Sequence, residues 1–131
     1  MYLVDTNIWL ERLLDQEKSG EVGRFFSNVP SDELFMTDFS FHSIGIAMQK
    51  LDRLDGLLTF VNDVFVKGAV TLLRVEPDKS QEIVEVIRRF NLDFDDAYQY
   101  VAAATHNLIL LSFDSDFDRT ERKRRSPHEI M

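Results

Sequence analysis

Cysteine is absent from the 131-residue sequence, which excludes disulfide bonds and cysteine-ligated zinc. No apolar run approaches the roughly 18 residues that a membrane-spanning helix needs. Asp5 interrupts the first apolar residues, so the start of the chain does not resemble a signal peptide. We therefore expect a cytoplasmic protein that makes no use of a membrane.

Basic residues are a minority, with 15 Lys and Arg against 23 Asp and Glu and a formal net charge of −8. This balance argues against a general nucleic-acid coat protein, because phosphate binding is driven largely by Lys and Arg. The basic residues gather in one segment, RTERKRR at 119–125. Hydrophobic residues make up 44% of the chain, enough for the core of one globular domain over 1–131.

Short apolar runs alternate with patterns typical of amphipathic helices. Strands are expected at 2–4, 33–36, 69–75 and 108–112. Helices are expected at 7–17, 20–28, 38–53, 55–68, 77–90 and 93–106. This alternation predicts an α/β fold, a three-layer α/β/α sandwich whose central sheet is mostly parallel.

Aspartates stand where the first and last expected strands end. Asp5 follows the strand at 2–4, Asp114 and Asp116 follow the strand at 108–112, and Asp96 lies at the start of the helix at 93–106. Simpler interpretations exist: a helix cap for Asp5, helix-start chemistry for Asp96, and a solvated or calcium-binding loop after the last strand. The calcium-loop pattern also needs a glycine and a distant glutamate, and neither follows here.

Because parallel strands end at the same edge of a sheet, these carboxylates can converge. Convergent carboxylates repel unless a cation lies between them, and an all-oxygen ligand set suits Mg²⁺ or Mn²⁺. Such ions activate a bound water and neutralise a phosphodiester. Thr6 and Ser112 are placed to hydrogen-bond the ligands or their waters. The pattern points to phosphodiester hydrolysis by metal-activated water, without a covalent protein intermediate.

Two segments, LVDTNIWL at 3–10 and DDAYQYVAAATHNLILLSFDSDF at 95–117, resemble the PIN domain family, specifically its VapC-type toxin ribonucleases. The resemblance spans nearly the whole chain. It implies an α/β/α sandwich, Mg²⁺- or Mn²⁺-dependent endoribonuclease activity on RNA, and a homodimer. A toxin of this kind implies an antitoxin protein as partner.

Carried over residue by residue, the resemblance makes Asp5, Asp96 and Asp114 the catalytic metal ligands. Asp116 falls on an auxiliary acid of the family. Thr6 and Ser112 match hydroxyl positions of the family.

One position departs from the family pattern, which has a segment resembling I-S-x-x-T-x-x-E. The corresponding segment is FMTDFSFHSIG at 35–45, and Ser43 is aligned with the glutamate. Serine supplies no negative charge, although its hydroxyl can still serve beside the metal ligands. Asp38 is a candidate replacement ligand, or else a helix cap. His42 is a second candidate, or else an ordinary half-buried histidine.

The basic segment and the missing glutamate leave two questions open. Its basic residues are expected either to contact RNA phosphates or to form a solvated face; they are Arg119, Arg122, Lys123, Arg124 and Arg125. The glutamate loss motivates an alternative function, a catalytically weak or inactive PIN-fold module that binds RNA or protein. A phosphoryl-aspartate receiver domain is disfavoured, because the first strand ends in one aspartate rather than a pair and no lysine follows the last strand.

Overall fold

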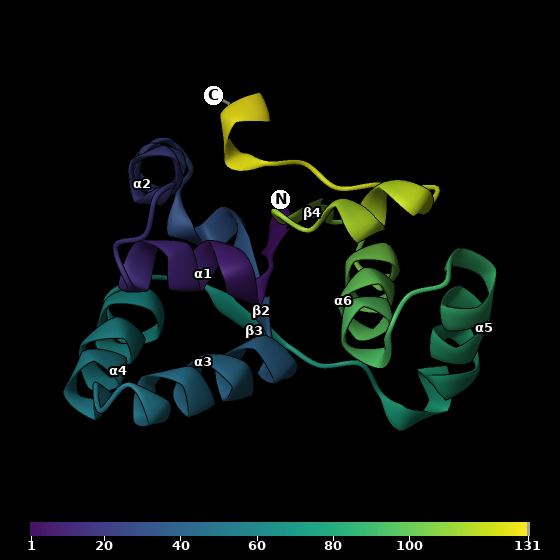
Figure 1. Cartoon of the computed structure of the whole chain (residues 1–131), viewed down its shortest axis with the longest axis horizontal. Helices are drawn as coiled ribbons and strands as arrows, with labels where there is room; N and C mark the ends of the chain where they lie inside the picture. The colour runs from purple at the N-terminus through teal and green to yellow at the C-terminus, as the bar shows by residue number, and fades with distance from the viewer. Residues whose placement is uncertain (131) are drawn as a thin grey trace.

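A computed structural model describes residues 1–130 and contains one four-stranded sheet (Figure 1). The strands are β1 (Tyr2–Val4), β2 (Leu34–Thr37), β3 (Thr71–Leu73) and β4 (Ile109–Leu111). Their order is β3-β2-β1-β4, and every neighbouring pair is parallel. The predicted α/β sandwich with a parallel sheet is confirmed.

Helices cover both faces of the sheet (Figure 1). One side holds α1 (Thr6–Leu13), α2 (Ser19–Asn28), α3 (Asp38–Lys50) and α4 (Leu54–Val61). The other holds α5 (Ser80–Phe90) and α6 (Phe94–Thr105). Short helical turns complete the chain: η1 (Ser31–Glu33), η2 (Asn62–Val66), η3 (Pro77–Lys79), η4 (Ser115–Arg119) and η5 (Pro127–Glu129).

Consecutive β1 side chains enter different cores, because successive side chains of a strand point to opposite faces. Val4 packs in the cluster beneath α1 to α4, whereas Leu3 packs in the cluster beneath α6. Ala102 and Ala103 of α6 are each only 1% exposed and belong to the same cluster as Leu3. Small side chains at these positions let α6 lie close to the sheet, so its first turn reaches the edge where β1 and β4 end.

Two helices differ most from the lengths that the sequence pattern predicts. The helix expected at 7–17 ends at Leu13, because the chain turns at Asp15, whose φ of 48° is left-handed. The helix expected at 55–68 leaves α geometry after Val61 and continues as the π-helical turn η2. Gly68 then ends it, and a Cβ at this position would lie 2.6 Å from the carbonyl oxygen of Val64.

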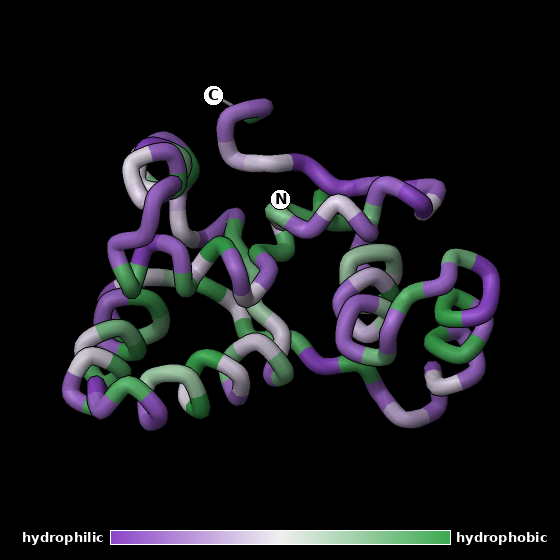
Figure 2. Tube along the Cα trace, in the orientation of Figure 1, coloured by the Kyte–Doolittle hydropathy of each residue, from purple (hydrophilic) through white to green (hydrophobic). Residues whose placement is uncertain are grey.

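The chain after β4 forms η4 and then returns along the sheet edge, where Arg125 bridges to Leu111. Figure 2 draws the stretch that follows η4 almost entirely as hydrophilic. It continues into η5, whose His128 N–H donates to Glu21 of α2 at 2.9 Å. Within residues 1–130, no helix has the length and apolarity needed to cross a membrane.

Candidate active site

Asp5 and Ser112 meet at the carboxyl ends of β1 and β4, which run side by side. The Asp5 backbone N–H donates to the Leu111 carbonyl at 2.9 Å, extending the pairing by one residue. The Ser112 hydroxyl then donates to Asp5 Oδ2 at 2.7 Å. The pairing of β1 with β4 therefore places Asp5 in contact with Ser112, which lies on the segment that carries Asp114.

The Asp5 carboxylate is only 7% exposed and accepts hydrogen bonds on both oxygens. Oδ1 accepts from the Thr6 backbone N–H at 2.8 Å, which caps α1, and from Gln99 Nε2 at 2.9 Å. Burial raises the pKa of Asp5 above its ordinary value, and the hydrogen bonds to its oxygens oppose this rise. The helix-cap interpretation and the site interpretation of Asp5 thus hold together.

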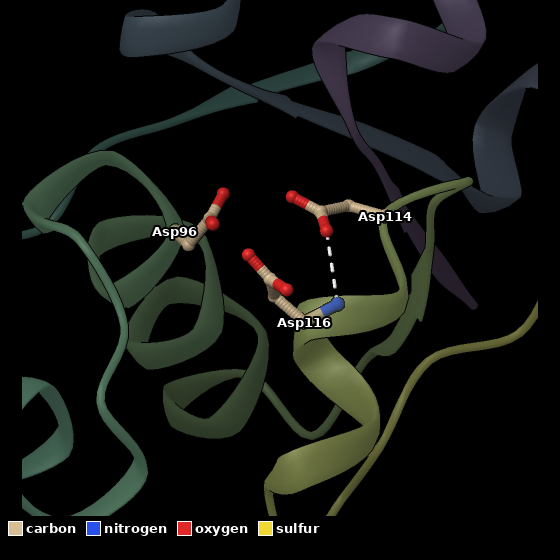
Figure 3. A group of neighbouring side chains, drawn as sticks. All are labelled: Asp96, Asp114 and Asp116. Atoms are coloured by element: carbon tan, nitrogen blue, oxygen red, sulfur yellow. Dashed lines mark hydrogen bonds between the residues drawn. The ribbon is translucent and has the colours of Figure 1, made fainter.

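Three further carboxylates gather beside it: Asp96 from the first turn of α6, and Asp114 and Asp116 from the start of η4 (Figure 3). One oxygen from each lies within 4.8 Å of the others. Asp114 Oδ1 accepts from the Asp116 N–H at 2.9 Å, so a tight local turn holds two of the three acids together. We call these three residues the acid group.

Without a cation, the negative charges of the acid group repel one another. The pKa of Asp96 is raised to about 7, first by burial and then by the negative charges of Asp114, Asp93, Asp5 and Asp116. A carboxyl whose pKa is raised by burial and by neighbouring negative charges is stabilised in its ionised form when a positive ion binds beside it. Three carboxylates without nitrogen or sulfur ligands match the preference of Mg²⁺ and Mn²⁺ for oxygen, so the residues fit such an ion.

Ser112 connects Asp5 to the acid group. Its oxygen accepts from the Asp114 backbone N–H at 3.0 Å while its hydroxyl donates to Asp5. Asn7 Nδ2 lies 3.3 Å from the same oxygen, and Asn7 Oδ1 accepts from the Phe113 N–H at 3.2 Å. The Ser112 hydroxyl therefore links Asp5 to Asp114, although Asp5 is not one of the three acids that share the 4.8 Å spacing.

Asp38 has a different environment from the acid group. It is exposed at the start of α3, and its Oδ1 accepts from the Tyr98 hydroxyl at 2.7 Å and from the Phe39 N–H at 2.8 Å. His42 is exposed on the next turn, so the expectation of a half-buried histidine is wrong. Among the described residues, the acid group includes no carboxylate from α3.

Ser40 is the serine of α3 that joins the hydrogen-bond network formed by Asp5, Thr6, Thr37 and Gln99. Its oxygen accepts from Thr6 Oγ1 at 2.8 Å and from Gln99 Nε2 at 2.7 Å. Ser43 lies one turn further along α3 and is half-buried. A role for the Ser43 hydroxyl beside metal ligands therefore stays a prediction.

Gln99 is the residue whose importance sequence reasoning missed. It is 1% exposed, donates to Asp5 and Ser40, and accepts from Thr37 Oγ1 at 2.6 Å. One signal for it exists in the sequence: Gln99 lies one helical turn before Ala102 and Ala103, two small residues of the kind that let a helix lie close to a sheet. A polar side chain on that face must find partners.

The basic segment is only partly free to meet a ligand. Arg122 donates to the Leu108 carbonyl at 3.1 Å, and half-buried Arg124 pairs with Asp118 at 3.2 Å. Arg119 pairs with Asp116 of the acid group at 3.5 Å. The side chains of Lys123 and Arg125 are exposed.

The PIN domain family model matches residues 2–123, and the chain belongs to this family. Its fold is similar to that of a toxin–antitoxin complex from Klebsiella pneumoniae, at 16% identity and TM-score 0.78, covering 97% of this chain and 98% of that one. VapC20 of Mycobacterium tuberculosis, a sarcin–ricin loop cleaving toxin, matches at 15% identity and TM-score 0.76, covering 90% and 93%. FitAcB of Neisseria gonorrhoeae matches at 16% and 0.76, covering 98% and 99%.

Sequence comparison with curated proteins gave no match. At sequence identities of 15 to 16%, the similarity to these solved structures concerns the fold alone. The resemblance seen in LVDTNIWL and in the segment at 95–117 is thus confirmed at the level of family and architecture.

Proposed function

We propose that this chain is a Mg²⁺- or Mn²⁺-dependent endoribonuclease that hydrolyses RNA phosphodiester bonds by metal-activated water. The observation that carries the proposal is the convergence of Asp96, Asp114 and Asp116 within 4.8 Å, beside a buried Asp5 that accepts hydrogen bonds on both oxygens. Membership of the PIN domain family supports the same chemistry.

The proposed roles follow from the hydrogen bonds and distances at the site. Asp96, Asp114 and Asp116 hold the divalent ion, and Asp5 adds fixed negative charge through the Ser112 bridge. When bound, the ion supplies a water of lowered pKa and neutralises charge on the phosphodiester. Asp38, whose carboxylate accepts a hydrogen bond from the Tyr98 hydroxyl, is not part of this ligand set.

Exposed basic side chains on the segment that follows the acid group in sequence serve the RNA backbone in this proposal. Arg119 is already in contact with Asp116, and Arg125 lies on the segment that hydrogen-bonds to Ser112. Arg122 and Arg124 hold that segment in place through backbone carbonyls and Asp118. Binding to phosphates positions a strand without reading its sequence.

We also propose that the protein is the toxin of a toxin–antitoxin pair, acting in the cytoplasm as a homodimer. The structural neighbours include a toxin–antitoxin complex and FitAB bound to a DNA fragment, which supports an antitoxin partner. A hollow of about 840 Å³ between α1, α2 and α4, lined by Trp9, Phe26 and Phe60 among others, offers apolar surface for such a partner.

A second candidate function is an inactive PIN-fold module that binds RNA or protein. The observation that favours it is the contribution of α3, which brings the Ser40 hydroxyl rather than a carboxylate into the network. With one acid fewer, metal affinity falls, and catalysis can be lost while the fold persists.

Cleavage of a mixed RNA pool distinguishes the two functions. We expect the wild type to cleave with Mn²⁺ or Mg²⁺ and to stop when a chelator is added. Asp5→Asn and Asp114→Asn should each abolish cleavage. The matched control is Asp32→Asn, an exposed aspartate before β2 at the opposite end of the strands, which should cleave like the wild type. Folded wild type that cleaves no faster than the two site variants would favour the inactive module.

A further inference from the structure

A second hollow, of about 460 Å³, lies between the first turns of α3 and α6. Four aromatic rings line it: Phe39, Phe41, Phe94 and Tyr98. The carboxylates of Asp38 and Asp95 and the His42 imidazole complete its wall. We call this feature the aromatic pocket; the proposed metal chemistry makes no use of it.

The rings of the aromatic pocket are held in place but left uncovered. Phe94 is 59% exposed and stacks on Tyr98 with centroids 6.4 Å apart, and Phe41 is 38% exposed. The Tyr98 hydroxyl donates to Asp38 at 2.7 Å and accepts from the Val75 N–H at 2.9 Å, which fixes that ring. Exposed apolar rings on rigid supports are the groups that stack well on a planar ligand.

The aromatic pocket is close to the acid group, because the first turn of α6 contributes to both. Asp95 lines the pocket, and Asp96, the next residue, belongs to the acid group. A helix with its side chains is about 10 Å across, so the two features lie within roughly that distance. A nucleic-acid strand with one phosphate at the acid group therefore has a neighbouring base within reach of the rings.

Charge selects among the ligands that the rings can accept. The carboxylates of Asp38 and Asp95 repel a phosphate or an acidic peptide at the pocket wall. A nucleobase carries no negative charge, has two π faces for stacking, and offers N–H groups to carboxylate acceptors. Single-stranded RNA is recognised largely through unstacked bases that stack on aromatic side chains.

We infer that the aromatic pocket binds an unstacked base of single-stranded RNA next to the phosphodiester that is cleaved. This inference rests on the proposed ribonuclease function. It adds a site that positions the strand through a base rather than through its phosphates, with Phe94 as the principal stacking residue.

Binding of a fluorescently labelled eight-nucleotide RNA tests the inference, with Ca²⁺ in place of Mn²⁺ and strand integrity checked on a gel. Phe94→Ala should raise Kd roughly 5- to 150-fold, the range expected for loss of one base–aromatic stack. Phe94→Tyr keeps a ring and should bind within about twofold of the wild type. The control Leu58→Ala removes an apolar side chain that is 68% exposed on α4 and should leave Kd unchanged.

A 2-aminopurine in the same RNA reports stacking directly. Its fluorescence should be quenched by the wild type and by Phe94→Tyr but not by Phe94→Ala. Because Phe94 is exposed at the start of α6, the variant should keep the wild-type thermal melting curve. Equal affinity and equal quenching in Phe94→Ala and the wild type would overturn the inference.

Two further outcomes separate the inference from other possibilities. If Phe94→Ala converts a dimer to a monomer while its RNA affinity stays unchanged, the pocket is an interface between copies and the inference fails. If RNA affinity depends on Phe94 but the wild type cleaves nothing, the base site stands and the proposed catalysis fails. If the wild type cleaves and Phe94→Ala binds normally, catalysis stands and the base site fails.

Discussion

Gln99→Leu removes the amide at the centre of the network beneath the acid group. Gln99 is 1% exposed, and its side chain makes hydrogen bonds to Asp5, Ser40 and Thr37. Leucine is apolar and one bond shorter, and it neither donates nor accepts hydrogen bonds. In the variant, the Thr6 N–H is the remaining donor to Asp5 Oδ1. The Thr37 hydroxyl loses Gln99 Oε1, the oxygen to which it donates.

The expected loss of stability follows from these hydrogen bonds. The hydrogen bond to the Asp5 carboxylate contributes about 1.5 to 3 kcal/mol when that group is charged, and the two neutral bonds about 0.5 to 1.5 kcal/mol each. Burial of the leucine side chain offsets roughly 1 to 2 kcal/mol. We expect the free energy of unfolding to fall by about 3 kcal/mol, within a range of roughly 0.5 to 5 kcal/mol.

The loss should also depend on pH. The Gln99 donor favours the ionised form of Asp5, so its removal raises the pKa of Asp5 further above the ordinary value. The folded variant then holds its proton to higher pH than the unfolded chain does, and its stability relative to the wild type declines as pH rises.

Urea denaturation at several pH values measures both effects, provided the m value is unchanged. The matched control is Gln81→Leu, the same chemical change on the exposed surface of α5, which should alter stability by no more than about 0.5 kcal/mol. If the two variants are equally stable, or if the difference between Gln99→Leu and the wild type is the same at every pH, the network does not support Asp5 as described.

Further predictions concern charge at the site. Without divalent ions, the free energy of unfolding should fall as pH rises from about 4 to 7, because the pKa of Asp96 is about 7 in the fold against an ordinary 3.8, so the native state binds the extra proton. Asp96→Asn should remove that component of the decline, and a variant whose stability falls with the wild-type slope would refute it. Replacing Arg119 and Arg125 by glutamine should reduce the salt dependence of binding to single-stranded RNA by about 0.7 in log–log slope for each phosphate that the protein no longer neutralises; an unchanged slope would make the basic segment a solvated face.

The strand ends of the candidate site were predictable from sequence. An aspartate at or shortly after the end of an apolar run, as at Asp5 and Asp114, is visible without structure, and the parallel sheet then brings such residues to one edge. Asp96 was predictable for a similar reason, because it opens a helix whose alanines face the sheet.

The interior of the site was not predictable to the same degree. Ser40 and Ser43 lie on the same face of α3, one helical turn apart, so which of them reaches the hydrogen bonds around Asp5 depends on how far along its axis α3 passes that residue. The exposed aromatic side chains also gave no signal, since Phe41 and Phe94 look like core residues until the packing of α3 against α6 is known. Local sequence fixes neither the position of a helix along its axis nor its packing against another helix.

RNA cleavage by the wild type and by Asp114→Asn, purified side by side, tests most directly whether the acid group supports RNA hydrolysis by metal-activated water. The readout is the rate in Mn²⁺ together with the chemistry of the new RNA ends, determined by mass spectrometry. We predict linear phosphate ends, because water rather than the 2′-hydroxyl is the nucleophile, and loss of these products in Asp114→Asn. Cleavage at the same rate by Asp114→Asn, or ends carrying a 2′,3′-cyclic phosphate, would contradict hydrolysis at the acid group.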